Sequence, residues 1–321
     1  MAKSAAIIGL GGIGMVYDLN LPNSVLSHAR SLSKHLDFEL VGAVDPDGIA
    51  RGIFTDRYGG LAFATVAELI NYCRPEVVVI ATPTDTHLAI IQDLLERHKP
   101  KIILCEKPLA YCEEDAKGIV DLCELKGVGL FINYIRRADP AVIEVKSRLL
   151  VGEIALPFKA VVWYSKGLIH NGSHFLDILI FWFGPVQSLK LIDRGRDLGL
   201  QDAEPDFQVE FECGTAVFCA ANEDNFSHYT IEILARNGRL RYEQGGIVNW
   251  QAAGQHPTLE NYRQLQITAE VIDNDMSHYQ YHVADQLSVA LRGNESTLCA
   301  GYDGLKVVTW LTNLLNERSK N

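Results

Sequence analysis

A glycine-rich turn directly behind the first apolar run constrains the fold of this chain more than any other feature. The run is Ala5–Ile8, and the turn reads Gly9-Leu10-Gly11-Gly12-Ile13-Gly14. Glycines in a G-x-G-x-x-G pattern permit a tight turn, let the backbone approach a pyrophosphate and let the next helix pack closely on the strand. We therefore expect a strand, the turn and a helix whose N-terminus faces negative charge. The expected dinucleotide contacts are Gly9, Gly11, Gly12, Ile13 and Gly14, and an ordinary strand–helix turn is the alternative.

Short apolar runs alternate with amphipathic stretches between residues 5 and 132. The runs are rich in β-branched residues and contain few polar ones, which is typical of parallel strands covered on both faces. Strands that alternate with helices predict a doubly wound α/β sheet with right-handed crossovers. The expected strands are Ala5–Ile8, Glu39–Val44, Val77–Ala81, Ile102–Cys105 and Gly129–Ile132, and the expected helices include Val66–Tyr72, His87–His98 and Glu113–Lys126.

The pattern changes after Tyr134. A helix over about Pro140–Leu150 leads into apolar runs separated by turn residues, and pairs such as Asn237-Gly238 predict hairpins between neighbouring runs. This predicts an α+β domain with a large, mostly antiparallel sheet that has one open face. Because the chain's 321 residues exceed what one hydrophobic core usually serves, we expect a Rossmann domain over residues 1–133 and a sheet-rich domain over 134–321. Its expected strands are Phe158–Tyr164, Gln187–Ile192, Phe207–Cys213, Thr215–Ala221, Tyr229–Ala235, Gly238–Glu243, Ile247–Trp250 and Leu265–Thr268, and helices are expected over Gln280–Arg292 and Tyr302–Glu317.

Charge and composition exclude several classes of partner. The formal net charge is −11 and no stretch gathers Lys and Arg, whereas nucleic-acid binding needs a basic patch. No apolar run approaches the roughly 20 residues of a membrane span, and the first apolar run is expected to be a strand of the fold rather than a signal peptide. Seven cysteines stand at irregular spacings without a C-x-x-C pair, so we expect reduced thiols and no metal site. These features predict a cytoplasmic protein that binds neither nucleic acid nor a membrane.

Asp45 follows the second expected strand, where a carboxylate can accept hydrogen bonds from the adenosine ribose hydroxyls. A carboxylate there repels a 2′-phosphate, which favours NAD over NADP. The spacing departs from the usual pattern, because Gly14 and Asp45 are 31 residues apart instead of about 20. Residues 17–23 therefore look like an insertion that interrupts the first helix before Ser24–His35 resumes it. The alternative role of Asp45 is that of a turn residue before Pro46.

Further sequence blocks make the chain resemble the Gfo/Idh/MocA family of oxidoreductases. They are Ala81-Thr82-Pro83-Thr84-Asp85-Thr86-His87, Cys105-Glu106-Lys107-Pro108-Leu109, Arg136-Arg137-Ala138-Asp139-Pro140, His170-Asn171-Gly172-Ser173-His174-Phe175-Leu176-Asp177 and Gly301-Tyr302-Asp303-Gly304-Leu305-Lys306. The resemblance covers nearly the whole chain in order. It implies a Rossmann domain followed by a substrate-binding domain whose open sheet face forms a homodimer or homotetramer contact. It also implies a sugar, sugar nucleotide or polyol as the substrate.

The resemblance assigns roles to the blocks that follow the glycine turn. It implies that the block around Thr82 lines the nicotinamide side of the cofactor, with Glu106 beside it. It makes Lys107 the catalytic-site lysine, and the Lys107-Pro108 peptide resembles one that is commonly cis in the family. Asn133, just past the last Rossmann strand, is a further expected contact at the nicotinamide end. The expected cofactor contacts outside the turn are Asp45, Thr82, Pro83, Thr84, His87, Glu106, Lys107 and Asn133.

Oxidation of a secondary alcohol sends a hydride to nicotinamide and a proton to a base, so the protein must orient the substrate and handle the proton. Lys107 follows the strand Ile102–Cys105 at the carboxyl edge, where open α/β sheets bind ligands. We expect Lys107 to act as general base or acid, because a lysine near the positive nicotinamide gives up its proton more readily. His174 can share that proton, with Asp177 one helical turn later as its partner. A surface lysine and a capping histidine are the alternatives.

The expected substrate site departs from the family pattern at one position. Many family sugar dehydrogenases carry aspartate four residues before the histidine, where this chain has His170. The aspartate–histidine proton relay of inositol-type members therefore does not transfer to this chain. The His-Asn-Gly-Ser-His block is similar to members from bacterial surface-sugar pathways, which favours an anionic or nucleotide-linked sugar. The expected substrate contacts are Lys107, Arg137, Tyr164, His170, Asn171, His174 and Asp177, with a loop-filling His170 and an ion-paired Arg137 as alternatives.

Together these patterns predict an NAD-dependent oxidoreductase that transfers a hydride at a secondary alcohol or ketone carbon, with Lys107 as general acid/base assisted by His174. Two other functions stay open. One is a regulator that senses NAD and a sugar without turnover, because a fold does not guarantee an activity. The other is a lyase or hydrolase that retains NAD and uses transient oxidation.

Overall fold

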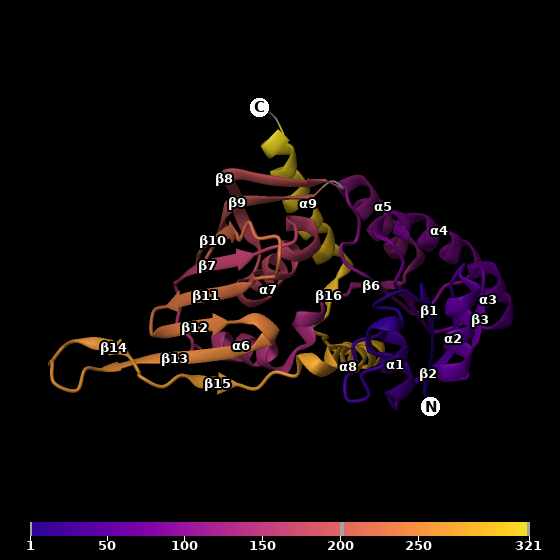
Figure 1. Cartoon of the computed structure of the whole chain (residues 1–321), viewed down its shortest axis with the longest axis horizontal. Helices are drawn as coiled ribbons and strands as arrows, with labels where there is room; N and C mark the ends of the chain where they lie inside the picture. The colour runs from indigo at the N-terminus through magenta and orange to yellow at the C-terminus, as the bar shows by residue number, and fades with distance from the viewer. Residues whose placement is uncertain (1, 200–201, 320–321) are drawn as a thin grey trace. The chain divides into compact units, whose positions relative to one another are not determined.

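A parallel sheet is built around β1 in the computed structural model, which describes residues 2–199 and 202–319 (Figure 1). Neighbouring strands run parallel, except that the last strand pairs antiparallel with the one beside it. The order of its strands is β16 (Cys299–Ala300), β6 (Gly129–Ile132), β5 (Ile102–Cys105), β4 (Val77–Ile80), β1 (Lys3–Ile8), β2 (Phe38–Val44) and β3 (Leu61–Phe63). From β1 the chain first adds strands on one side (β2, β3) and then on the other (β4, β5, β6). Doubly wound sheets bind ligands at the point where this order switches, which here lies between β1 and β4.

The central strands are buried along their whole length. Val77–Ile80 and Ile102–Cys105 have no exposed or half-exposed residue, as expected for β-branched runs in a covered parallel sheet. Their side chains join a core that also contains Phe54 and Leu287. The helices of this unit are α1 (His28–Lys34), α2 (Gly48–Tyr58), α3 (Val66–Tyr72), α4 (His87–Arg97), α5 (Glu113–Lys126) and α8 (Tyr279–Leu291).

Local signals explain where several of these helices begin and end. Asp47 caps α2 by accepting a hydrogen bond from Ile49 N, and Gly59 ends that helix in the left-handed conformation. Thr65 and Glu68 form a capping box at the start of α3. These caps satisfy backbone groups that a helix end otherwise leaves without partners.

A second sheet is mostly antiparallel, and within the described residues only β7 and β10 pair in parallel. Strand β7 alternates strictly between buried and exposed residues, so one face of the sheet is packed and the other is open. The strand order is β14 (Arg263–Leu265), β13 (Val248–Gln255), β12 (Gly238–Tyr242), β11 (Thr230–Ala235), β7 (Phe158–Tyr164), β10 (Gly214–Ala220), β9 (Asp202–Phe211) and β8 (Val186–Gly199), and β15 (Glu270–Ile272) pairs with β13 (Figure 1). Helices α6 (Pro140–Leu150) and α7 (Ser173–Phe183) accompany this sheet. The predicted fold class, a Rossmann domain plus a sheet-rich α+β domain, is confirmed.

The chain divides into two compact units whose boundary differs from the expected one at residue 133. Residues 1–138 and 277–309 form the first unit, and 139–276 and 310–321 form the second. The later segment returns to the first unit because β16 adds to the edge of the parallel sheet and α8 packs against α1. Helix α9 (Gly301–Ser319) contributes its first half to the first unit and its second half to the other.

Several elements lay outside the sequence expectations. Strands β3, β15 and β16 have only two or three residues each, which is too short for a periodic pattern. Strand β8 continues to Gly199, beyond the expected end at 192, and β9 begins at Asp202, before the expected start at 207. Most of the added residues are not apolar, so an apolar pattern did not reveal them. Across residues 2–199 and 202–319, no helix combines the length and the apolar character that a membrane crossing requires.

Candidate functional site

The glycine turn follows β1, and close backbone contacts fix its shape. Gly9 has a φ of +100°, and a Cβ there would stand 2.4 Å from the carbonyl oxygen of Ala81. A Cβ on Gly14 would stand 2.1 Å from the carbonyl oxygen of Gly9, so a side chain fits at neither position. Among the described residues, no atom outside Gly11 and its two chain neighbours lies within 4 Å of a Cβ built on Gly11. The turn is therefore closed on its inner side and open at Gly11, as close approach of a pyrophosphate requires.

An inserted loop interrupts the helix behind this turn. The backbone N–H of His28 donates to the carbonyl oxygen of Ile13 at 3.0 Å. In an uninterrupted helix the residue four positions after Ile13 would make this bond, so eleven residues, 17–27, are inserted. Subtracting these eleven from the 31 between Gly14 and Asp45 leaves 20, the usual spacing of the fingerprint. The expected interruption of the helix is confirmed, and it is longer than residues 17–23.

Asp18 holds the inserted loop from inside. Its fully buried carboxylate accepts hydrogen bonds from the backbone N–H groups of Leu26 and Ser27 at 2.7 and 2.9 Å, and from Ser27 Oγ at 2.7 Å. The Nε atom of Arg30 lies 3.5 Å from Asp18 Oδ1, and its guanidinium also donates to the carbonyl oxygen of Leu21. A buried carboxylate is tolerated only with such partners. The loop is therefore an integral part of the fold at this end of α1.

Tyr17 begins the inserted loop and packs on the glycine turn. A Cβ on Gly12 would stand 2.5 Å from Tyr17 Cε1, so the ring lies directly against the Gly12 Cα. Tyr17 is 57% exposed, because its other face is open. The ring therefore borders the open side of the turn.

Asp45 ties the end of β2 to the glycine turn. Its Oδ2 accepts a hydrogen bond from Leu10 N at 2.7 Å, and its Oδ1 accepts one from Asp47 N at 2.8 Å. A carboxylate has about four acceptor positions, so these two bonds leave room for ribose hydroxyls. Asp45 is thus a turn residue and is also suitable for binding a ribose.

The loop after β4 is fixed by His87. This residue is fully buried, and its Nε2 and Nδ1 lie 3.0 Å from the carbonyl oxygens of Thr82 and Leu109, respectively. His87 therefore joins the loops that follow β4 and β5. The contact of His87 with a cofactor stays a prediction, whereas Thr82, Pro83 and Thr84 are partly or fully exposed.

Glu106 is the centre of a buried hydrogen-bond cluster. Its Oε1 accepts a hydrogen bond from Asn133 Nδ2 at 2.6 Å and lies 2.7 Å from His28 Nε2. Lys107 N donates to Glu106 Oε2 at 3.3 Å, and the Lys107-Pro108 peptide is cis, which confirms that expectation. Burial alone would raise the pKa of Glu106, but the hydrogen bonds from His28 and Asn133 outweigh it and lower that pKa. A carboxylate is therefore held directly beside Lys107.

The sequence profile described as "Oxidoreductase family, NAD-binding Rossmann fold", that of Gfo/Idh/MocA, matches residues 3–134. These residues belong to the Gfo/Idh/MocA family. The residues that match the family profile thus include the glycine turn, Asp45, His87 between its two loops, and the hydrogen-bond cluster around Glu106.

The chain is similar to dehydrogenases with named substrates. Inositol 2-dehydrogenase of Rubrobacter xylanophilus is 31% identical over 170 residues, which are 53% of this chain and 46% of that protein. Glucose-6-phosphate 3-dehydrogenase of Bacillus subtilis is 30% identical over 198 residues, 62% of this chain and 51% of that protein. The chain thus spans about half the length of these relatives.

Solved structures match over nearly the whole chain. The crystal structure of the WlbA dehydrogenase from Bordetella pertussis in complex with NADH and UDP-GlcNAcA has a TM-score of 0.75 and 19% identity. The match covers 100% of this chain and 97% of that one. At this identity the likeness establishes the fold, including the sheet-rich unit that the family profile does not reach.

The second unit contains most of the residues expected to meet a substrate, whereas Lys107 and Arg137 lie in the first. His174 and Asp177 are buried in the first turns of α7, at 7% and 0% exposure. His170 and Asn171 lie just before that helix in a π turn (Leu168–Gly172), and Asn171 Nδ2 donates to the carbonyl oxygen of Ser165 at 2.7 Å. His170 has a 41% exposed side chain and a close carboxylate partner.

Two expected substrate contacts have other roles in the structure. Tyr164 is fully buried between Phe207 and Phe218, and its hydroxyl donates to the carbonyl oxygen of Pro205 at 2.5 Å. Burial therefore raises the pKa of Tyr164, and the residue belongs to the core instead of a substrate surface. Arg137 is 4% exposed and lies 3.8 Å from a carboxylate oxygen of Asp303 in the same unit. The ion-paired alternative for Arg137 matches this contact.

Sequence reasoning missed Tyr17, Asp18 and His28 near the glycine turn. The unusual spacing before Asp45 was the available signal, because any insertion there must be anchored by its own residues. Asp202 was also missed. It begins β9 in a polar stretch without an apolar pattern, so its burial follows from tertiary contacts.

Proposed function

We propose that this chain is an NAD-dependent oxidoreductase acting on a secondary alcohol or ketone carbon of a sugar, sugar nucleotide or polyol. The glycine turn carries the proposal, because it is closed by backbone contacts at Gly9 and Gly14 and open at Gly11. The family match over residues 3–134 and the dehydrogenase relatives support it. The Asp45 carboxylate favours NAD, since it would repel the 2′-phosphate of NADP.

The residues of the first unit fit a dinucleotide. The turn Gly9–Gly14 would hold the pyrophosphate and Asp45 the adenosine ribose. The exposed block Thr82–Thr84 would hold the nicotinamide end, together with Glu106 and Asn133. When bound, the cofactor supplies hydride acceptance and donation.

Proton handling falls to the protein. Lys107 would take the hydroxyl proton when an alcohol is oxidised and return it when a ketone is reduced. Glu106 would fix the backbone of Lys107 through its Oε2, at 3.3 Å from Lys107 N. His174 would assist Lys107, with Asp177 one turn later on α7.

Substitution of Lys107 tests this assignment. NADH binding is measured by fluorescence, and NAD reduction is followed with myo-inositol, glucose 6-phosphate and UDP-N-acetylglucosamine as alcohols. Lys107→Ala should bind NADH with an affinity within about threefold of the wild type. Its turnover number should fall about 10²- to 10⁴-fold, which is the usual contribution of a general acid or base. Lys101→Ala is the matched control, because Lys101 lies at the opposite end of the same strand and pairs with Glu76.

The outcomes also separate the alternatives. Full activity of Lys107→Ala would contradict its role as a base. NADH binding without reduction of NAD by any alcohol would indicate a regulator. Conversion of an alcohol substrate without net NADH formation would indicate a lyase or hydrolase that retains the cofactor.

We further propose that the open face of the second sheet binds another copy of this chain. Val161 and Trp163 on β7 are 41% and 42% exposed, and Leu234 on the adjacent β11 is 54% exposed. Neighbouring exposed apolar side chains of this kind are typical of protein contacts. The family resemblance supports a homodimer or homotetramer.

A further inference from the structure

We propose that Asp202 is a positioning residue that presents His170 as a hydrogen-bond acceptor for a hydroxyl group of the substrate. The inference rests on the proposed function and names a specific contact within it. The contacts that support it lie inside the second unit, between the first residues of β9 and the π turn that precedes α7.

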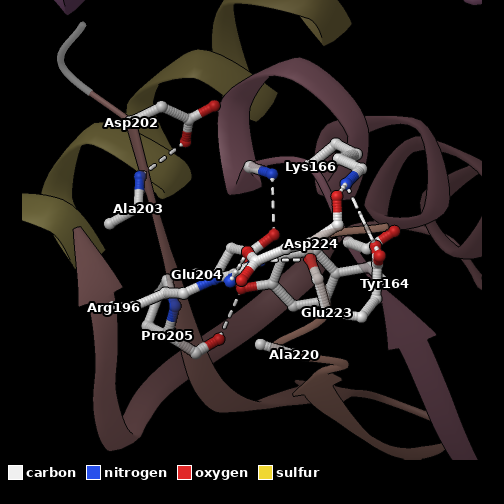
Figure 2. A network of polar contacts seen from close by, with 12 residues as sticks. Tyr164, Lys166, Arg196, Asp202, Ala203, Glu204, Pro205, Ala220, Glu223 and Asp224 are labelled. Carbon is white, nitrogen blue, oxygen red and sulfur yellow. Dashed lines mark hydrogen bonds and ion pairs between the residues drawn. The ribbon is translucent and has the colours of Figure 1, made fainter. Parts of the chain in front are cut away.

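The Asp202 carboxylate is buried against that turn. Its Oδ2 lies 2.6 Å from His170 Nδ1 and accepts a hydrogen bond from His170 N at 3.1 Å. Its Oδ1 accepts hydrogen bonds from Ile169 N and Ala203 N, both at 2.9 Å. The Asp202 side chain is 3% exposed, whereas that of His170 is 41% exposed. Figure 2 shows Asp202 and its bond to Ala203 at the start of β9.

This pairing determines which ring nitrogen carries the proton. A carboxylate only accepts hydrogen bonds, so Nδ1 of His170 must be the donor. In the neutral imidazole the other nitrogen, Nε2, then has the lone pair. When the ring is neutral, the exposed part of His170 therefore presents a hydrogen-bond acceptor, suited to a hydroxyl group.

The surrounding backbone lets the Asp202 carboxylate lie close to the π turn. Gly167 has a φ of +94°, and a Cβ there would stand 2.1 Å from Asp202 Oδ2, so only glycine lets the carboxylate reach the turn. The fully buried Glu204, two residues along β9, accepts a hydrogen bond from Gly167 N at 3.2 Å. Its other oxygen binds Arg196 Nε at 2.5 Å (Figure 2). Glu204 is thus neutralised by Arg196, while Asp202 has the imidazole of His170 as its polar side-chain contact on the turn.

Burial of two carboxylates is costly unless each has partners. A turn that only needed backbone acceptors could use neutral side chains, so the charge of Asp202 requires a further reason. Control of the His170 ring supplies one. It also gives a function to a histidine at a position where the family often has aspartate, because the imidazole presents no negative charge to the substrate.

The tautomer of His170 tests the positioning directly, without a substrate. In ¹⁵N-labelled wild-type protein above the titration of the ring, the Nδ1 signal of His170 should be that of a protonated nitrogen and the Nε2 signal that of an unprotonated one. In Asp202→Asn the amide oxygen is expected to stay with Ile169 N and Ala203 N, because the NH₂ group then opposes one backbone donor, His170 N, whereas the reverse orientation opposes two. The amide NH₂ then faces Nδ1, and the proton should move to Nε2.

Kinetics test the consequence for the substrate. With the best alcohol of the panel, Asp202→Asn should lower kcat/KM about 10- to 100-fold while NADH affinity stays within about threefold. His170→Ala should cost a similar factor, and the double variant should cost no more than either, because both changes remove one contact. Asp206→Asn is the matched control, since Asp206 lies on the same strand and accepts a backbone hydrogen bond from Ala220 N at 2.7 Å.

A wild-type His170 that carries its neutral-form proton on Nε2 would overturn the proposal. So would an Asp202→Asn variant with wild-type kcat/KM, or an Asp206→Asn variant with the same loss. If the wild-type protein oxidises no alcohol of the panel, the proposed function fails and the substrate role of His170 fails with it. The Nδ1-protonated ring would then still be observed, so the two failures are distinguishable.

Discussion

Two glycines of the turn are in contact with different kinds of neighbour. Gly14 faces backbone, because a Cβ there would stand 2.1 Å from the Gly9 carbonyl oxygen. Gly12 faces a side chain, because its Cβ would meet the Tyr17 ring at 2.5 Å. A ring can rotate away, whereas the backbone of a turn cannot move without changing the turn. The two positions should therefore respond differently to a second substitution.

Gly12→Ala should weaken NADH binding about tenfold, which corresponds to about 1.4 kcal/mol, because the displaced Tyr17 ring moves over the open side of the turn. Gly12→Ala/Tyr17→Ala should recover most of that loss, since the shorter side chain leaves room for the added methyl group. Fluorescence titration of NADH measures both. Gly14→Ala should bind weakly with or without Tyr17→Ala, and rescue of Gly14→Ala by that change would contradict the contact assignment.

At the scale of elements, the inserted loop depends on one buried carboxylate. Asp18→Ala removes the acceptor for Leu26 N and Ser27 N and leaves Arg30 buried without its carboxylate partner. Breaking such a buried pair costs about 3–5 kcal/mol. We expect residues 19–26 to become sensitive to limited proteolysis and NADH binding to weaken. Asp121→Ala, an exposed change on α5, should do neither, and a protease-resistant loop in Asp18→Ala would contradict the assignment.

A contact between α6 and β15 should make the stability of the second unit depend on pH. Arg148 on α6 binds Glu270 on β15 through two hydrogen bonds of 2.8 and 2.7 Å, and this pairing lowers the pKa of Glu270. A carboxyl whose pKa is lower in the folded state stabilises the fold above its unfolded pKa, and that contribution disappears as the pH falls through the folded value. Because the Glu270 side chain is 51% exposed, the effect should be small, at most about 1 kcal/mol.

Glu270→Gln should therefore lower the stability of the second unit at pH 7, and the difference from wild type should shrink below about pH 4. Urea unfolding at several pH values measures it. Glu260→Gln, on an exposed part of the β13–β14 connection, serves as the control. A difference that persists unchanged at low pH would contradict a charge-based contribution.

The elements also show what sequence periodicity can predict. Val77–Ile80 and Ile102–Cys105 were predictable because each is an unbroken apolar run that is buried on both faces. The first residues of β9 were not, because Asp202 and Glu204 are polar residues whose burial depends on partners distant in sequence. Gly14 and Asp45 were predictable from their motif, but the anchoring of the loop between them by Asp18 was not.

At the scale of the whole molecule, we expect association through the open face of the second sheet. Trp163→Asp places a charge among the exposed apolar side chains of β7 and β11 and should shift the protein toward monomers. Light scattering with size-exclusion chromatography measures the mass. Leu259→Asp is the control, because Leu259 is 53% exposed and lies outside the strands. A monomeric wild-type protein would contradict this interface.

The central claim is that the open glycine turn after β1 binds a nicotinamide dinucleotide. Isothermal titration calorimetry of the wild-type protein with NADH and with NADPH tests it most directly. We predict one NADH bound per chain, and weaker binding of NADPH by about tenfold or more, because the Asp45 carboxylate disfavours a 2′-phosphate. Absence of saturable heat with either dinucleotide would contradict the claim.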